Sequence, residues 1–432
     1  MKATAVPPAS TDIAERTRRR ISRRLIPFLF ILYIISYLDR VNLSYAGLEM
    51  TKELHFSNEV FGFGSGIFFL GYVLLEIPGT ILVELWSARK WISRIMLTWG
   101  FVAALTGLIH SKQEFYWARF LLGVAEAGFF PGVIVYLTHW FRAADRAKAV
   151  AMFMAAIPVS QIVGSPVSAA LMKIHWLGYS GWRWLLILEG LPAVVAGIIT
   201  FFYLTDRPED AKWLPADERD WITGELERER NAVTAKEKIS VWRAFLHRDV
   251  LLLTAVYFFG TNISYGFTLW LPKMVQKLSG FSPYVVTLLS AIPFIATWPF
   301  MLLVGWNSDR TGERRWHTAG SLVLAAAGLA LARATDSVPI GILAFTIAAM
   351  GINGRLPSFW ALPNQFLAGT SAAAVIGSIN CVGNTGGFVG PYFVGWLTDK
   401  TGTYAAGVLY LIGSALISAV LVLMVRPRKV VA

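Results

Sequence analysis

Two opposite charges stand side by side inside the first long apolar stretch of the chain. Asp39 and Arg40 lie between residues 25 and 46, where most neighbours are apolar. Placing one charged side chain at the centre of a membrane-spanning helix costs about 2.5–3.5 kcal/mol on insertion scales, so such groups normally face a bundle interior or a watery cavity. We predict that the pair belongs to a substrate or proton site. The alternative is that the two charges neutralise neighbours and hold helices together.

A second pair of charges lies in the fourth long apolar stretch. Arg119 and Glu126 are seven residues apart, so in a helix they share one face at about 10.5 Å along the axis. That separation is too long for a direct ion pair, and we expect their partners on another helix. Because consecutive helix positions point about 100° apart, Asp39 and Arg40 are expected to have different roles.

The residue types suggest what those roles are. Arg40 is predicted to bind a substrate carboxylate, because a planar guanidinium suits bidentate binding. Asp39 and Glu126 are the predicted proton carriers. Burial disfavours the charged form of a carboxyl group and a neighbouring arginine favours it, so substrate arrival or helix movement can change proton occupancy. The alternative for Glu126 is a structural salt bridge with Arg40, and both roles can hold at different stages of one cycle.

Further polar and aromatic side chains within apolar stretches are candidates for substrate contact. Gln161 and Asn384 lie beside Gly/Pro interruptions at corresponding places in the two halves of the chain, a feature that points towards a transporter site. For each polar candidate the alternative is an interhelical hydrogen bond, and for Trp360 it is packing. Arg355 is an extra charge that could serve a second carboxylate or pair with a neighbour. The predicted substrate contacts besides Arg40 are Arg119, Tyr72, Gln161, Asn262, Tyr265, Ser358, Trp360 and Asn384.

The composition shows what kind of element positions these residues. Hydrophobic residues make up 55% of the chain and charged residues 15%, whereas soluble domains contain roughly 25% charged residues. The net charge of +12 could suggest nucleic acid, but the cations gather in short segments between apolar runs, which excludes that class. Cys381 is the only cysteine and the six histidines are scattered, so no disulfide, metal site or other cofactor is predicted. No local catalytic constellation is present, and we predict that the chain is not an enzyme.

Apolar stretches of membrane-spanning length come in two groups of six. The first group lies near 24–46, 59–82, 92–110, 115–138, 148–173 and 182–204, and the second near 250–271, 284–306, 317–334, 339–362, 370–395 and 403–425. The first stretch is too long for a signal peptide and lacks a cleavage site, so it is predicted to remain as a helix. The predicted division is a tail over 1–23, a bundle over 24–205, a linker over 206–247, a bundle over 248–425 and a tail over 426–432.

Lysine and arginine set the orientation. Basic clusters follow the second, fourth and eighth stretches and the last one, all on one side of the predicted membrane, which places both termini in the cytoplasm. The first helix then runs outward and the fourth inward. Their depths place Asp39 opposite Arg119, with Arg40 and Glu126 slightly deeper.

The linker is predicted to contain a surface helix. Pro215 is followed by acidic residues and then by a run rich in Glu and Arg up to Asn231, a pattern typical of a helix start. Such a charge run usually forms a solvated face; the alternative is a docking element for a partner.

Two related loop motifs suggest that the halves are homologous. After the second stretch, residues 79–90 read GTILVELWSARK, and after the eighth, residues 305–315 read GWNSDRTGERR. The second closely resembles the G-x-x-x-D-R-x-G-R-R motif of the major facilitator superfamily, whereas the first departs from it, with Glu84 in place of Asp. The motif concerns architecture and conformational change rather than substrate, and its residues here are Gly79, Glu84, Gly305, Asp309, Arg310, Gly312 and Arg314. The resemblance implies an all-α membrane fold of 12 transmembrane helices in two pseudo-symmetric six-helix bundles.

Five further segments narrow the resemblance. They are YLDRVN at 37–42, RFLLGVAEAGFFPG at 119–132, GWRW at 181–184 with EGLP at 189–192, FWALP at 359–363 and NTGGFVGPY at 384–392. Together they resemble the anion:cation symporter family, which includes bacterial tartrate, galactonate, phthalate and 4-hydroxyphenylacetate permeases. The resemblance implies proton-coupled uptake of a small organic anion by alternating access, in the inner membrane and as a monomer.

Uptake of an organic anion with protons is therefore the predicted function. Buried arginines beside buried acids suit an anion better than a drug or cation exporter, which would more naturally use unpaired acids. A non-transporting sensor of an organic acid is the other alternative. A sugar acid, a dicarboxylate and an aromatic carboxylate all remain open as substrates.

Overall fold

The regular elements of the described residues are helices. The computed structural model describes residues 8–234, 247–363 and 370–426, and within them the only strand-like pairing is one isolated bridge between Trp176 and Tyr179. In lipid every backbone polar group must be satisfied within the protein, and helices do this within a single segment. The predicted all-α membrane fold is confirmed.

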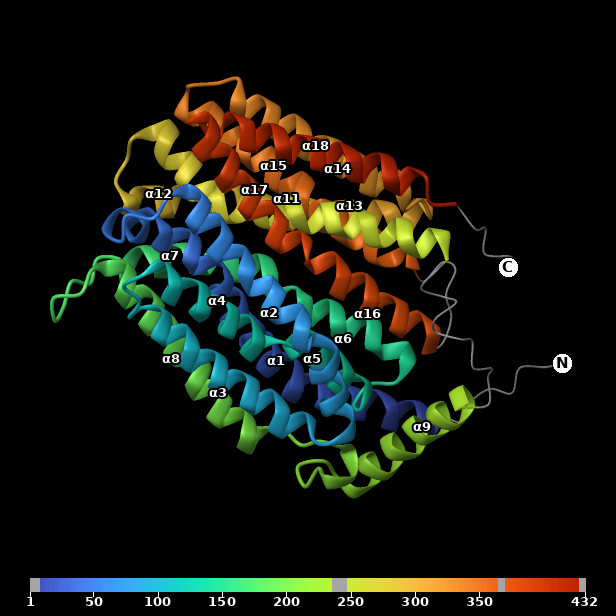
Figure 1. The fold of residues 1–432 in the computed structure, drawn as a ribbon. Coiled ribbons are helices and arrows are strands. Elements are labelled where there is room, and N and C mark those ends of the chain that lie inside the picture. The colour runs from blue at the N-terminus through green and yellow to red at the C-terminus, as the bar shows by residue number, and fades with distance from the viewer. Residues whose placement is uncertain (1–7, 235–246, 364–369, 427–432) are drawn as a thin grey trace.

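Figure 1 shows two groups of helices side by side, with one further helix at the end of the molecule. The N-terminal half contains α1 (Pro8–Glu53), α2 (Asn58–Leu85), α3 (Ala88–Thr106), α4 (Lys112–Glu126), α5 (Phe129–Thr138), α6 (Ala143–Met154), α7 (Ala156–Leu171) and α8 (Gly181–Tyr203). The C-terminal half contains α11 (Arg248–Ser279), α12 (Pro283–Leu289), α13 (Ile292–Thr311), α14 (Arg315–Arg333), α15 (Val338–Ala361), α16 (Thr370–Asn384), α17 (Gly386–Thr401) and α18 (Tyr404–Leu423). Between them lie a 3₁₀ turn (Pro208–Asp210) and α9 (Ala216–Thr234).

Four of the predicted spans consist of two helices joined end to end: α4 with α5, α6 with α7, α12 with α13, and α16 with α17. At the first of these breaks Gly128 has φ +82°, a left-handed conformation that glycine adopts without steric cost. The break follows Glu126 directly, so it lies beside a predicted functional residue. Within the described residues, nine helical segments are long and apolar enough to cross a membrane.

The start of α1, the end of α18 and α9 lie at the same end of the molecule, which we call the linker end (Figure 1). Arg248 at the start of α11 donates to the carbonyl of Met424, just after α18, at 3.3 Å. The positive-inside pattern predicts that this end is cytoplasmic. The other end, where α1 ends and α2 begins, is called the opposite end.

The linker helix α9 is attached to the N-terminal half. Glu218 is fully buried and lies within 3.0 Å of the Nε atom of Arg16 and 2.9 Å of that of Arg20, both on α1. Glu229 accepts from the backbone N–H of Ala143 at the start of α6. The predicted linker helix is present, and part of it packs on the chain itself rather than forming a solvated face. The predicted tail over 1–23 is helical from Pro8 onward, as the first turns of α1.

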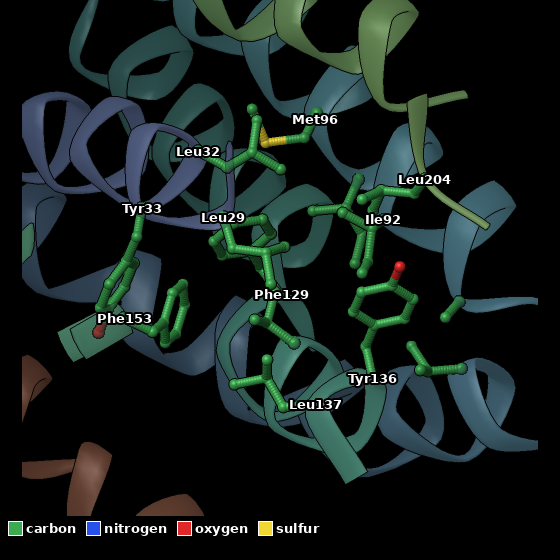
Figure 2. Close-up of a cluster of buried hydrophobic side chains, with 14 of the residues drawn as sticks. Leu29, Leu32, Tyr33, Ile92, Met96, Phe129, Tyr136, Leu137, Phe153 and Leu204 are labelled. Atoms are coloured by element: carbon green, nitrogen blue, oxygen red, sulfur yellow. The ribbon is translucent and has the colours of Figure 1, made fainter. Parts of the chain in front are cut away.

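A buried apolar cluster holds the N-terminal half together near the linker end. Figure 2 shows Leu29, Leu32 and Tyr33 of α1 facing side chains of α3, α5 and α6. The ring of Tyr33 stacks on that of Phe153 with centroids 4.3 Å apart. Burial of this cluster fixes the rotation of α1, and therefore the directions in which Asp39 and Arg40 point.

The two halves contact one another closely at the opposite end. Asp399 of α17 accepts from the backbone N–H groups of Asn58 and Glu59 at 3.2 and 2.7 Å, so it caps the start of α2. Further along α2, a Cβ atom added at Gly66 would lie 2.6 Å from the carbonyl oxygen of Phe388, so only glycine allows this approach. The opposite end is thus closed between α2 and α17.

Candidate functional site

A cavity of about 100 Å³ lies between the two halves, near the middle of their length. Six of the nine predicted substrate contacts line it: Arg40, Tyr72, Gln161, Tyr265, Trp360 and Asn384. They come from α1, α2 and α7 on one side and from α11, α15 and α16 on the other. Tertiary structure therefore brings most of the predicted contacts to one place.

Arg40 is held against Glu126 at the wall of this cavity. One oxygen of Glu126 accepts from Nε of Arg40 at 2.8 Å and from Nη2 at 2.5 Å, and Ser36 donates to the same oxygen at 3.0 Å. The Glu126 side chain is fully buried, whereas that of Arg40 retains 12% exposure. The guanidinium also lies 5.2 Å from the ring of Tyr72, at cation–π distance. This is the salt bridge given above as the alternative role of Glu126.

Arg40 also reaches the other half of the protein. Its Nη1 atom donates to the hydroxyl of Tyr265 on α11 at 3.3 Å. Anything that draws the guanidinium away from Tyr265 therefore changes a contact between the halves.

Asp39 points in a different direction from Arg40, because neighbouring helix residues are rotated by about 100°, and it is not among the residues that line the cavity. It is buried and accepts from Trp99 Nε1 at 2.9 Å and from Asn42 Nδ2 at 3.2 Å. No ion pair joins Asp39 to the buried Arg119 within the described structure. Neither Asp39 nor Glu126 lines the cavity itself.

Three predicted substrate contacts lie outside the cavity lining. Arg119 is buried against the ring of Phe68 at 5.1 Å, and Asn262 donates to the hydroxyl of Tyr410. Ser358 is fully buried. None of the three is among the residues that line the cavity in this structure, and their contact with substrate stays a prediction.

Arg355 of α15 lines the cavity on the side of the C-terminal half. Its Nη2 atom donates to the carbonyl of Gly260 at 2.6 Å and to the hydroxyl of Ser264 at 2.9 Å. Both acceptors are neutral, and in the described part of the chain no acid pairs with this arginine. The cavity thus has one arginine bridged to an acid and one without a counter-charge.

Sequence reasoning missed several residues of the lining. Tyr33 and Tyr37 precede Arg40 by seven and three positions, so the helical spacing could have indicated them. Asn380 lies one turn before Asn384, so the same helical spacing could have indicated it. It donates to Glu76 of α2 and accepts from the hydroxyl of Tyr257 at 3.2 Å, linking the two halves. Glu76 itself is buried.

The predicted gating motifs lie at the linker end, each with contacts inside its own half. A carboxylate oxygen of Glu84 lies 2.7 Å from Nε2 of His139 and accepts a hydrogen bond when that nitrogen carries the proton, and Asp309 pairs with Arg314. Gly312 ends α13 with φ +69°, and Arg310 lies 5.5 Å from the Trp306 ring. Gly79 and Gly305 each pack closely on a neighbouring segment, at Ala127 and Pro357. The motifs therefore brace the ends of α2 and α13.

Comparison with known proteins identifies the family. The model of the Major Facilitator Superfamily matches residues 29–391. A protein of Agrobacterium vitis named "Putative tartrate transporter" is 44% identical over 96% of this chain and 95% of its own length. A "Quinolone resistance transporter" of Acinetobacter baumannii is 36% identical over 93% of this chain and 92% of its own length.

The fold also matches a solved structure. A bacterial homologue of the human lysosomal transporter Spinster superposes with a TM-score of 0.74 at 16% identity, covering 95% of both chains. The Agrobacterium vitis and Acinetobacter baumannii relatives are both named as transporters, in agreement with the prediction that the chain is not an enzyme. The helices, their apolar lengths and these similarities agree: the chain is a multi-pass membrane protein that belongs to the major facilitator superfamily.

Proposed function

We propose that the protein takes up a small organic anion together with protons. The observation that carries this proposal is the position of Arg40, a cavity-lining guanidinium whose acidic partner Glu126 is fully buried behind it. A site with Arg40 on one wall and Arg355 on the other attracts anions. The tartrate transporter relative supports a carboxylate as the substrate.

Competition for Arg40 explains how anion and proton binding would be linked. With Glu126 ionised, Arg40 is held by two hydrogen bonds to one of its oxygens. Protonation of Glu126 removes that negative charge and frees the guanidinium for a substrate carboxylate. An incoming anion favours protonation of Glu126 for the same reason. Substrate and proton then bind together.

Arg355 would bind a second carboxylate. Its present partners, the Gly260 carbonyl and Ser264, leave its charge uncompensated in the described structure. Such a site favours a dicarboxylate over a monocarboxylate, because each anionic group would find its own cation.

Asp39 is the proposed second proton carrier. It is separated from the cavity, and its hydrogen bonds come from Trp99 and Asn42. Its charge interacts with Arg119, which is also buried. Proton uptake there would not compete directly with the anion. Asp39 would then carry the proton that drives uptake, while protonation of Glu126 would depend on substrate binding.

The test is uptake by purified protein in liposomes with an imposed inward proton gradient. Labelled tartrate, galactonate, a hexuronate, phthalate and hydroxyphenylacetate form the panel, with a quinolone as the exporter control. We expect one carboxylate to accumulate and the accumulation to collapse with an uncoupler. Asp39→Asn should abolish gradient-driven accumulation but retain exchange of labelled for unlabelled anion, whereas the exposed Glu227→Gln should behave as wild type.

Three outcomes would reject the proposal. If uptake of every acid is indifferent to the gradient, protons are not coupled to transport. If a folded protein binds a carboxylate but moves none, the protein acts as a sensor. Gradient-driven quinolone efflux without anion uptake would support the exporter alternative.

A further inference from the structure

Two hollows meet on the outer side of the N-terminal half, away from the cavity between the halves. One, of about 680 Å³, lies at the linker end of α1 and is lined by five arginines. The other, of about 780 Å³, is an apolar groove between α1 and α8. Arg23, Arg24 and Tyr203 line both hollows, so the two are continuous. We call them the arginine hollow and the α1/α8 groove.

The arginines of the hollow fall into two sets. Arg16 and Arg20 are paired with Glu218 of α9. Arg19, Arg23 and Arg24 have no acidic partner within the described residues, and Arg23 and Arg24 also line the groove. The acids of the hollow, Asp12 and Glu15, precede them, and along the helix axis Glu15 is about 6 Å from Arg19 and about 12 Å from Arg23.

Arg24 is fixed at the junction of the two hollows. Its guanidinium lies 4.5 Å from the ring of Tyr203 and 4.8 Å from that of Trp213, and the Tyr203 hydroxyl donates to the Arg24 carbonyl at 3.1 Å. Its Nε–H is buried and has no hydrogen-bond partner in the described structure. The two rings hold the guanidinium in place at the junction, where its positive charge attracts an anionic ligand.

The groove is lined by apolar side chains of both α1 and α8. Leu191, Val195 and Ile199 follow one another at four-residue spacing on α8, and each is about half exposed. Ile31 of α1 is also half exposed and forms the facing wall. The groove runs from the arginines towards the middle of the two helices, parallel to the predicted membrane normal.

We propose that the arginine hollow and the α1/α8 groove together bind one anionic phospholipid. Its phosphate contacts Arg19, Arg23 and Arg24, and one acyl chain lies along α8. The positive-inside pattern alone would place arginines at this interface, but it does not require an apolar groove that opens directly beside unpaired ones. Because Arg24 and Arg40 are about 24 Å apart along α1, this ligand is distinct from the transported anion.

The test is lipid retention and thermal stability of the purified full-length protein. Native mass spectrometry counts bound lipids, and Tm is measured with added phosphatidylglycerol, phosphatidylcholine or glycerol phosphate. We expect phosphatidylglycerol to be retained and to raise Tm more than phosphatidylcholine, with no effect of glycerol phosphate. Arg19→Gln/Arg23→Gln should lose most of that difference. Val195→Trp, which fills the groove without changing charge, should lose it as well.

The matched control is Arg89→Gln/Lys90→Gln, which removes two charges at the same end of the same half. Equal loss in this control would show diffuse charge attraction and overturn the proposal. An equal effect of glycerol phosphate would make the hollow a site for free phosphate, and indifference to lipid charge would remove the headgroup contact. A dimer that dissociates on Val195→Trp would assign the groove to a second copy of the chain.

Discussion

The contact between Arg40 and Glu126 is an ion pair largely removed from water. A charge pair removed from water loses solvation, and it is tolerated only when hydrogen bonds satisfy both partners. Here one oxygen of Glu126 accepts from Arg40 and Ser36, while its other oxygen is buried with no hydrogen-bond partner in the described structure. An acid satisfied on one side alone is well suited to change its charge during a cycle.

Removing one member of this pair should be worse for stability than removing both. Arg40→Gln leaves the buried Glu126 without its cation and is expected to destabilise the protein by about 3–5 kcal/mol. Arg40→Gln/Glu126→Gln should recover most of that loss but still fail to bind the anion. Thermal unfolding in detergent and uptake in liposomes measure the two effects separately. A loss of stability in the double variant equal to the sum of the two single losses would show that the two side chains are not energetically coupled.

At the scale of elements, α9 connects the linker to α1. Glu218 is buried between two arginines of α1, and Glu229 caps the start of α6, so one helix contacts two spans of the same half. The discontinuous α4–α5 span has its break directly after Glu126, where Gly128 has a positive φ. The contacts of α9 with α1 and α6, and the break between α4 and α5, all lie near helix ends rather than in the middle of helices.

Glu218→Gln should loosen α9 from the N-terminal half. The change removes the charge that both Arg16 and Arg20 contact, and we expect a loss of about 1–3 kcal/mol. Limited proteolysis within residues 206–247 should become faster, and Tm should fall. Glu227→Gln, at an exposed position of the same helix, is the matched control and should leave both unchanged. Identical cleavage of the two variants would mean that the contact with α1 does not hold the linker helix.

At the scale of the whole molecule, the two halves meet at the opposite end through α2 and α17. Asp399 caps α2 from across the interface, and close glycine contacts continue along the two helices. Near the cavity, Asn380 donates to Glu76 and Arg40 donates to Tyr265, again between halves. Alternating access would require the contacts at the opposite end to open.

A covalent link at the opposite end should therefore stop transport. In a Cys381→Ser background, Asn58→Cys/Asp399→Cys joined by a short thiol crosslinker should hold this end closed. We expect uptake to fall to the level of empty liposomes, while either single-cysteine variant treated in the same way keeps its activity. Full activity of the crosslinked protein, with the link verified by mass spectrometry, would exclude opening between α2 and α17.

The membrane spans follow from the amino-acid sequence alone. Lipid offers no hydrogen bonds to the backbone, so apolar runs of about 20 residues must become helices whatever surrounds them. The twelve predicted spans accordingly all fall on helices or joined helix pairs. The cost of burying charge likewise singles out Asp39, Arg40 and Glu126 by their residue types and their places in apolar runs. The division into domains and the roles of these residues remain predictions.

Tertiary packing was needed to establish which of those residues share a site. Whether Asp39 or Arg40 faces the cavity depends on the rotation of α1, which packing around Leu29 and Leu32 fixes. The contact of Glu76 with Asn380 joins residues 304 positions apart, and no local pattern encodes such a pairing. The attachment of α9 also depends on this rotation, because it brings Arg16 and Arg20 beside Glu218. Spans follow from local solvation, whereas the site follows from how the helices pack.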